Sequence, residues 1–200
     1  MSEILKLSFN NERKEKLYEL IQKNISIKKG AVINFLNTRT LYLANKDKFY
    51  HAVLKDSTYR IADGTPLVWL LNLKSYKKYK TLQGPEFFNF ILSKSMNVSH
   101  FLLGDTLDVL QEINKKYKEK SHITGFYSPP FTNIENFDYH TSSVMISKNK
   151  PDIVWVALGS PKQDIVSKKL AIKFPNTIFI NVGAAFRHSL GKFTDPPNFI

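Results

Sequence analysis

The chain has 200 residues, 42% of them hydrophobic, which is enough to bury a core and argues against wholesale disorder. It contains no cysteine, which excludes disulfides, thiolate zinc sites and a cysteine nucleophile. No apolar run approaches the ~18 residues of a membrane span, and the charged N-terminus is unlike a signal peptide. We therefore expect a cytoplasmic protein. Its net charge of +12 predicts an acidic partner, with nucleic acid, anionic lipid and a phosphorylated substrate as candidates.

Strands and helices are predicted to alternate along the chain. No repeat or linker interrupts them, so we expect a single domain over residues 1–200. The first half is predicted to contain a strand at Ile4–Ser8, a helix at Glu12–Lys23 capped by Asn10 or Asn11, a strand at Ala31–Leu36, a helix from about Thr38 to Val53, a strand at Tyr59–Ala62, and helices at Thr65–Leu73, with Thr65 as its cap, and at Glu86–Ser95.

The second half continues the alternation. Its continuous apolar segment at Asp152–Leu158 is typical of a strand covered by helices on both faces. The pattern predicts an α/β fold with a doubly wound, mostly parallel sheet and helices on both faces. The remaining predicted elements are strands at Val98–Leu103, His122–Tyr127 and Thr177–Val182, a helix capped by Asp105 and reaching Tyr117, a helix at Ile134–Ser147, and a helix opened by Pro161 with Ser160 and Gln163 at capping-box spacing.

Small, polar or turn-forming residues follow nearly every predicted strand. The carboxyl ends of parallel strands lie at one edge of a sheet, and this edge is where α/β folds bind ligands. The segment Gly159–Asp164, GSPKQD, offers the N-terminus of a helix beside Lys162 and suits a diphosphate, although an ordinary well-capped helix explains it equally well. Asp63-Gly64 lies where a strand gives way to a helix. By itself this pair fits either a chemical role or a simple turn.

Several familiar sites are missing from the sequence. There is no G-x-G-x-x-G, no Walker-type phosphate loop and no G-x-S-x-G. The five histidines lack the spacing of metal ligands, and no Asp-x-Asp is present to hold a metal against a diphosphate. We therefore expect no metal and no cofactor. Any departing diphosphate would have to be stabilised by Lys, Arg and backbone N–H groups.

The segment Leu73–Lys80, LKSYKKYK, combines four lysines (Lys74, Lys77, Lys78 and Lys80) with two tyrosines and has no acid. It fits an anionic membrane surface or a phosphorylated acceptor. A solvated lysine-rich loop explains it as well. RNA binding also uses basic residues beside aromatic ones, but no RNA-binding motif accompanies them, so we expect no nucleic-acid partner.

Several motifs follow one another from about Ala31 onward, at Ile33–Asn37, Ile61–Trp69, Leu82–Phe88, Phe101–Asp105, Tyr127–Phe131, Asp152–Asp164 and Asn181–Phe186. In this order and spacing they resemble the WecG/TagA/CpsF glycosyltransferases. The resemblance implies a Rossmann-like, inverting, metal-independent enzyme. Such an enzyme moves a hexosyl or N-acetylhexosaminyl group from a UDP-sugar to a lipid-diphosphate-linked sugar, in bacterial cell-surface polysaccharide or teichoic-acid-type synthesis. It implies a peripheral location on the inner face of the cell membrane.

The resemblance also implies roles for individual residues. Asp63 matches the general base that takes a proton from the acceptor hydroxyl, and Asn37 and Gln163 match pocket residues that position substrate hydroxyls. Tyr127 and the turn after it are expected to line the nucleotide pocket. The further residues expected to bind substrate are Asn34, Gly64, Lys80, Thr81, Gly159, Ser160, Lys162, Gly183 and Arg187.

The sequence departs from the family pattern at several positions. Asn34 replaces a threonine, Lys80-Thr81 replaces an arginine, and Phe186-Arg187-His188 replaces Phe-Asp. Thr194-Asp195-Pro196 stands where relatives read Arg-Ala-Pro, and the sequence ends at Ile200, before the family's basic C-terminal segment. These departures leave a second hypothesis open, a non-catalytic nucleotide-binding partner of another glycosyltransferase. A homo-oligomer is a further candidate partner state.

Overall fold

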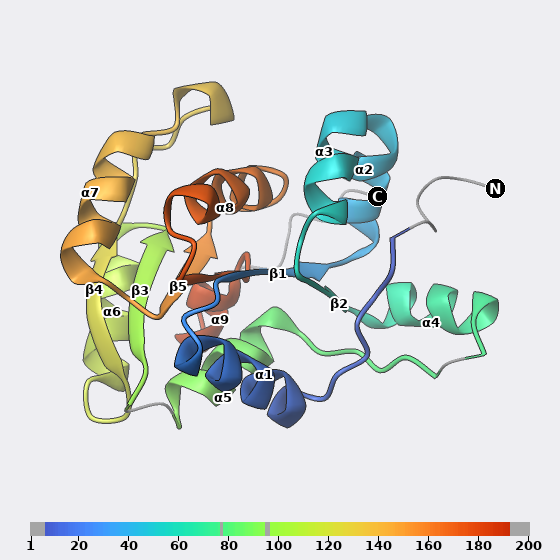
Figure 1. Cartoon of the computed structure of the whole chain (residues 1–200), viewed down its shortest axis with the longest axis horizontal. Coiled ribbons are helices and arrows are strands. Elements are labelled where there is room, and N and C mark those ends of the chain that lie inside the picture. The colour runs from blue at the N-terminus through green and yellow to red at the C-terminus, as the bar shows by residue number, and fades with distance from the viewer. Residues whose placement is uncertain (1–6, 77, 95–96, 193–200) are drawn as a thin grey trace.

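The computed structural model describes residues 7–76, 78–94 and 97–192 (Figure 1). Within these residues, six parallel strands form one sheet in the order β2-β1-β6-β5-β3-β4. This confirms the predicted α/β doubly wound class, and the sheet is parallel throughout. The strands are β1 (Ala31–Leu36), β2 (Tyr59–Ala62), β3 (Ser99–Gly104), β4 (His122–Tyr127), β5 (Ile153–Ala157) and β6 (Ile178–Asn181).

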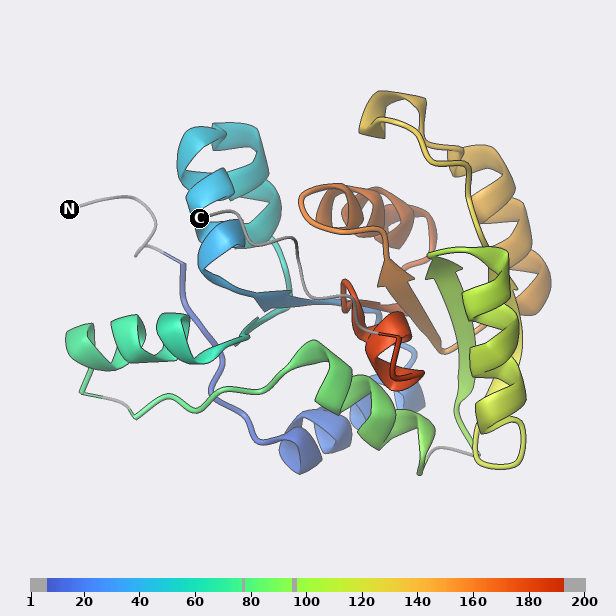
Figure 2. The same ribbon diagram turned by 180° about the vertical axis from the view of Figure 1, so that it is seen from behind.

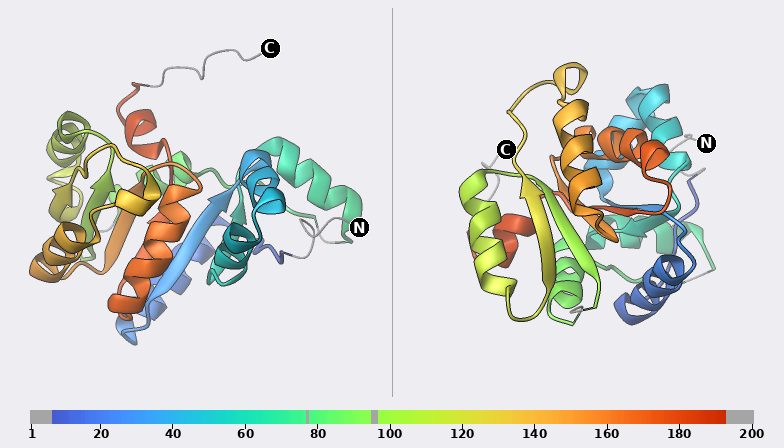
Figure 3. Two further views of the ribbon diagram at one scale, coloured as in Figure 1. Left: turned by 90° about the horizontal axis from the view of Figure 1, so that it is seen from above. Right: turned by 60° about the vertical axis from the view of Figure 1, so that its left-hand side comes forward.

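Helices cover both faces of the sheet, as Figures 1 and 2 show. One face carries α2 (Thr38–Lys46), α3 (Lys48–Lys55), α7 (Tyr139–Asn149) and α8 (Lys162–Lys173). The other carries α1 (Lys14–Ser26), α5 (Gly84–Leu92), α6 (Leu107–Tyr117) and α9 (Ala185–Ser189). The helix α4 (Thr65–Lys74) instead projects beyond the edge formed by β2 (Figure 3).

The central strand β5 shows how the sequence builds two cores at once. Successive side chains on a strand point to opposite faces, and here both faces are covered. Ile153 and Trp155 pack among the residues of α1, α5 and α6, whereas Val154 and Val156 pack with α7 and α8. Trp155 is fully buried, and its ring meets that of Phe88 on α5 edge-on at 5.0 Å between centroids.

The neighbouring strands β1 and β6 send their chains to opposite faces of the sheet. After β1 the chain enters α2 on one face, and after β6 it enters α9 on the other (Figure 3, left). Among the described residues, no connection therefore lies across their carboxyl ends, and this divergence leaves a crevice at the sheet edge.

Side-chain caps account for two differences from the predicted helices. The helix predicted over 38–53 is two helices, because the Asp47 carboxylate caps α3 by accepting the Phe49 N–H at 2.8 Å. Likewise, the helix predicted over 134–147 is a 3₁₀ turn at Ile134–Asn136 followed by α7, which Asp138 caps through the Thr141 N–H.

The predicted caps of four other helices are wrong. At α1, which starts after Arg13, Asn10 instead accepts the Arg60 N–H, and Asn11 bonds residues 78 and 80. At α4, Gly64 precedes the helix with φ of +94°, and at α6 the N-cap is Thr106. At α8 the N-cap is Pro161, which makes no side-chain cap bond. The predicted strand at 4–8 lies partly outside the described residues, and Leu7 and Ser8 are not in a strand.

A substitution of Gly104 can test how tightly the carboxyl end of β3 packs against β5. A Cβ at this position would lie 2.4 Å from the Ala157 carbonyl oxygen, and the backbone φ is +116°. Gly104→Ala should therefore lower the free energy of unfolding by about 3–5 kcal/mol in urea titrations, because overpacking adds to backbone strain. Gly191→Ala is the matched control, since its φ is +68° but a Cβ there meets nothing within 4 Å. Equal losses in the two variants would show that close packing at Gly104 contributes nothing.

Candidate active site

A cavity of about 460 Å³ opens at the carboxyl ends of the strands, at the crevice between β1 and β6. Segments that are far apart in the sequence meet there. Asn37 follows β1, Asp63 follows β2, Gly159 and Ser160 follow β5, and Gly183 follows β6. The first turn of α8 adds Gln163. The cavity thus brings the Asp63 carboxylate and the turn at 159–163 into one site.

Asp63 is held at the end of β2 by backbone contacts. Its N–H donates to the Leu36 carbonyl at 2.8 Å, which continues the pairing of β1 with β2 by one residue. Burial raises the pKa of the Asp63 carboxyl, and a hydrogen bond from the Gly84 N–H offsets only part of that rise. The next N–H, that of Gly64, donates to Thr81 Oγ1 at 3.0 Å. The carboxylate is therefore fixed in place and is a stronger base than an exposed aspartate.

Gln163 joins the turn after β5 to the turn after β6. Its Oε1 accepts the Gly183 N–H at 3.1 Å, and its Nε2 donates to Ser160 Oγ at 3.2 Å. The side chain is 3% exposed although it lines the cavity. The capping box predicted from its spacing to Ser160 does not form, because the side chain serves this contact between strands.

Asn37 caps α2 at the other side of the cavity. Its Oδ1 accepts the Thr40 N–H at 3.0 Å, and Thr40 Oγ1 accepts the Asn37 N–H at 2.8 Å, which together form a capping box. Within the described part of the chain, the Asn37 amide nitrogen makes no hydrogen bond. It can therefore donate to a ligand.

The chain belongs to the WecG/TagA/CpsF family. Its sequence matches the glycosyl transferase family of that name over residues 2–200. It is 27% identical over 181 residues to the N-acetylglucosaminyldiphosphoundecaprenol N-acetyl-beta-D-mannosaminyltransferase of Bacillus subtilis, an alignment that covers 88% of this chain and 69% of that one. The enzyme of the same name from Bacillus spizizenii is 26% identical over 176 residues, covering 86% and 66%. The chain thus spans about two thirds of the length of these relatives.

In this family member, six of the predicted site residues line the cavity and the others lie outside it. The six are Asn37, Asp63, Gly159, Ser160, Gln163 and Gly183. Gly64 and Thr81 bond each other beside Asp63, and the Lys80 N–H donates to Asn11 Oδ1 at 2.9 Å. Lys162 Nζ donates to the Thr132 carbonyl at 2.7 Å, and the Tyr127 hydroxyl donates to Asp138 at 3.1 Å.

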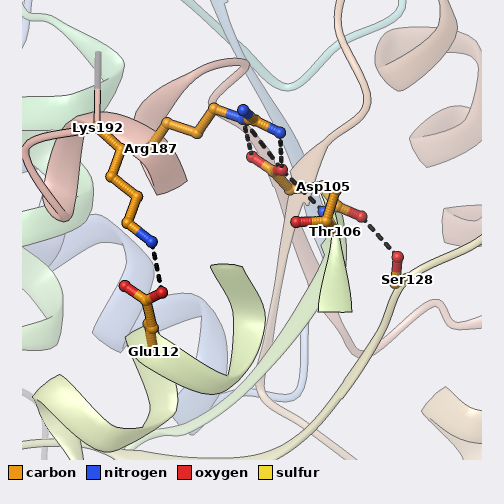
Figure 4. A network of polar contacts seen from close by, with 6 residues as sticks. All are labelled: Asp105, Thr106, Glu112, Ser128, Arg187 and Lys192. Atoms are coloured by element: carbon orange, nitrogen blue, oxygen red, sulfur yellow. Dashed lines mark hydrogen bonds and ion pairs between the residues drawn. The ribbon is translucent and has the colours of Figure 1, made fainter. Parts of the chain in front are cut away.

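Arg187 is held by an ion pair at the rim of the sheet (Figure 4). Its guanidinium donates to both carboxylate oxygens of Asp105, with the shortest contact 2.8 Å from Nη2 to Oδ1. Asp105 has φ of +60°, accepts the Thr106 N–H at 2.8 Å and, through its carbonyl, accepts the Ser128 hydroxyl at 2.7 Å. These contacts tie α9 to the ends of β3 and β4.

The cavity also contains residues that the sequence reasoning did not assign. Arg39, in the first turn of α2, is exposed and is the arginine that lines the cavity among the described residues. Gln83 before α5 and His188 on α9 line it as well. One indication of these residues was present in the sequence, which is that each lies next to a segment already expected to form the site. Nothing in the sequence shows which side chains face a common space.

A network of buried polar side chains lies beneath the cavity. Asp164 is 1% exposed and accepts the Tyr50 hydroxyl at 2.6 Å, the Asn181 amide at 3.4 Å and the Ser160 hydroxyl. Burial raises the pKa of the Asp164 carboxyl to about 6. Asn34, predicted to bind substrate, is fully buried in this network, where it contacts Asn181 and donates to Ser57 Oγ at 2.6 Å.

Neither metal ligands nor a spanning helix are evident in the described structure. Within residues 7–76, 78–94 and 97–192, no group of three or more His, Asp or Glu side chains is placed to hold a metal ion. Over the same residues, every helix is too short or too polar to traverse a bilayer.

The raised pKa of Asp164 predicts how stability changes with pH. Because the folded state binds this proton more tightly than the unfolded chain does, the contribution of Asp164 to stability is complete below about pH 4 and is lost as the pH rises through about 6. The free energy of unfolding of the wild type, minus that of Asp164→Asn, should therefore fall by about 2–3 kcal/mol between pH 4 and pH 7.

Asp56→Asn is the control for this measurement. Lys168 lowers the pKa of the Asp56 carboxyl, so the corresponding difference should change with pH in the opposite direction. A flat or rising difference for Asp164→Asn in urea titrations across this pH range would contradict the assignment.

Proposed function

We propose that this chain is an inverting glycosyltransferase that moves a sugar from a UDP donor to a lipid-diphosphate-linked N-acetylglucosamine. The observation that carries the proposal is the shared cavity of Asp63 and the turn at 159–163. The first supplies a base, and the second supplies a place for a diphosphate. The family and the names of the two Bacillus relatives support the reaction class and the acceptor. Those names also make an N-acetylmannosaminyl group the first donor sugar to test.

The proposed chemistry is a single displacement. An acceptor hydroxyl oxygen attacks the anomeric carbon of the donor, the bond from that carbon to the diphosphate oxygen breaks, and UDP leaves. Asp63 takes the proton of the hydroxyl as the new bond forms. Because burial raises its pKa, the carboxylate is better matched to this transfer near neutral pH than an ordinary aspartate.

The negative charge of the departing UDP would be stabilised by groups around the cavity. The first turn of α8 presents backbone N–H groups at the positive end of its helix dipole, and Arg39 adds a guanidinium at the first turn of α2. Guanidinium groups bind phosphate oxygens in pairs, which favours Arg39 over a lysine in this role. This arrangement supports a metal-independent reaction, as does the absence of Asp-x-Asp in the sequence.

Asn37 and Gln163 would orient the substrates. The Asn37 amide nitrogen lies on the same cavity as Asp63 and can bind a sugar hydroxyl. Gln163 already bonds Ser160 and the Gly183 N–H, so it would act mainly by fixing the shape of the pocket. We further propose that the protein works at the membrane surface, where a lipid-linked acceptor is found.

Asp63→Asn tests the proposed base. The substitution should leave UDP affinity nearly unchanged in calorimetric titrations and lower turnover roughly 10²–10⁴-fold, the usual contribution of a general base. The assay uses the full-length protein, UDP-N-acetylmannosamine and a lipid-diphosphate N-acetylglucosamine acceptor. Asp108→Asn, an exposed carboxylate on α6, is the control and should keep wild-type turnover.

Two outcomes would count against this mechanism. Normal turnover in Asp63→Asn would remove Asp63 as the base. UDP binding by the wild type without turnover on several donors and acceptors would favour a non-catalytic partner of another glycosyltransferase.

Arg39→Ala tests the proposed diphosphate contact. Loss of a charged hydrogen-bond donor should weaken UDP binding by roughly 10–100-fold, and Arg39→Lys should recover only part of it. Arg13→Ala is the matched control, since Arg13 is an exposed arginine before α1 and its side chain makes no cap bond. Unchanged UDP affinity in Arg39→Ala would exclude a role for this guanidinium in donor binding.

A further inference from the structure

The helix α4 is apolar on its outer face as well as on the face that packs against the protein. Its sequence is TPLVWLLNLK. Leu67 and Leu71 share one face of the helix and are buried in the apolar cluster that α4 forms with α2 and α3. On the side away from them, Trp69 is 67% exposed and Leu73 is 63% exposed. Helices that are apolar all round are normally enclosed by protein or by lipid, so the outer face of α4 calls for a partner.

The exposed apolar residues lie together at the outer end of the molecule. Trp69 and Leu73 are four residues apart on a helix and therefore share a face. Tyr76 is fully exposed just beyond the helix, which ends at its C-cap Ser75. Figure 3 shows α4 extending away from the sheet and its covering helices.

The chain that returns from α4 is held firmly against it. The side chain of Asn72 accepts the Tyr79 N–H at 2.6 Å and donates to the Tyr79 carbonyl at 3.2 Å. From the other side, Asn11 donates to the Lys78 carbonyl at 2.8 Å and accepts the Lys80 N–H. The helix and the returning segment thus form one projecting unit, which we call the α4 projection and define as residues 65–76 and 78–80.

The charge of the α4 projection indicates what it contacts. No acidic residue occurs between Asp63 and Glu86, whereas Lys74, Lys78 and Lys80 are exposed on the projection. Lys77 belongs to the same basic run and lies outside the described residues. Lysines beside exposed Trp, Tyr and Leu match an anionic lipid surface, because the rings and Leu enter the interface while the ammonium groups stay at the headgroups.

We propose that the α4 projection docks the protein onto a bilayer rich in anionic lipid, with Trp69, Leu73 and Tyr76 inserted into the interface. This inference rests on the proposed function, because that function gives the protein a membrane-bound substrate. The helix begins directly after Asp63-Gly64, so docking it places the mouth of the cavity beside the membrane that carries the acceptor.

Tryptophan fluorescence gives a direct test of insertion. The chain has two tryptophans, and Trp155 is fully buried, so a change on adding vesicles reports on Trp69. Vesicles of equal parts phosphatidylglycerol and phosphatidylcholine should shift the emission to the blue and shield it from acrylamide. Pure phosphatidylcholine should do so far less, and high salt should weaken the effect. Trp69→Phe should abolish the spectral change while the protein still sediments with the vesicles.

A double variant then tests the energetic contribution of the apolar face. Trp69→Ser with Leu73→Ser should lower partitioning onto the anionic vesicles at least about tenfold, because both side chains lose apolar burial. Ile27→Ser with Ile172→Ser is the matched control, since these residues are 58% and 76% exposed elsewhere on the surface. It should bind vesicles as the wild type does. Circular dichroism verifies that both variants remain folded.

Turnover separates this proposal from the proposed function. The double variant should lose turnover on a lipid-linked acceptor in anionic vesicles and keep it on a short-chain, water-soluble acceptor, whereas Asp63→Asn should lose both. Vesicle binding equal to the wild type in the double variant, or no vesicle binding by the full chain, would overturn the proposal. Two further results would overturn it. Shielding of Trp69 from acrylamide without vesicles, at higher protein concentration alone, would indicate that a second copy of the chain covers α4. Shielding on addition of RNA alone would indicate an RNA partner.

Discussion

The candidate site depends on the opposite directions in which the chain leaves two neighbouring strands. Since β1 leads to α2 on one face and β6 leads to α9 on the other, no connection within the described part of the chain crosses the sheet edge between them. The ends of β2 and β5 complete the resulting cavity with Asp63 and the turn at 159–163. One topological constraint therefore brings together a buried carboxylate and a helix N-terminus, the two groups that the proposed reaction uses.

Polar side chains connect the walls of the cavity to one another and to the elements beneath it. Gln163 bonds the turns after β5 and β6, and Asp164 next to it bonds Tyr50 of α3 and Asn181 of β6 below the floor. A buried carboxylate is costly unless such partners satisfy it, and here the partners also connect α8 to α3 and β6. At the rim, Asp105 and Arg187 fix α9 in the same way.

The α4 projection connects the chemistry to the place where it is proposed to occur. Asp63 ends β2, Gly64 turns the chain, and the next ten residues form a helix whose inner face packs on the protein and whose outer face is left apolar. The proposed base and the proposed membrane-docking surface are contiguous in the chain and would therefore move together. An exposed apolar helix is costly to leave in water, and membrane docking offers a physical reason for its position beside the cavity. The family to which the chain belongs includes enzymes named for lipid-diphosphate substrates.

Local pattern in the sequence was sufficient for the strands and for the class of fold. The β1, β2 and β4 boundaries were predicted as they occur, because each is a short run of β-favouring residues bounded by turn residues. The sequence also marked Asp63 and the 159–163 turn, since both follow strands. It did not show that Asn34 is buried, that Arg187 pairs with Asp105, or that Arg39 lines the cavity. It also placed the caps of four helices wrongly. The positions of Asn34 and Arg187 depend on partners 147 and 82 residues away, Asn181 and Asp105. Only the packed tertiary structure brings such partners within hydrogen-bonding distance.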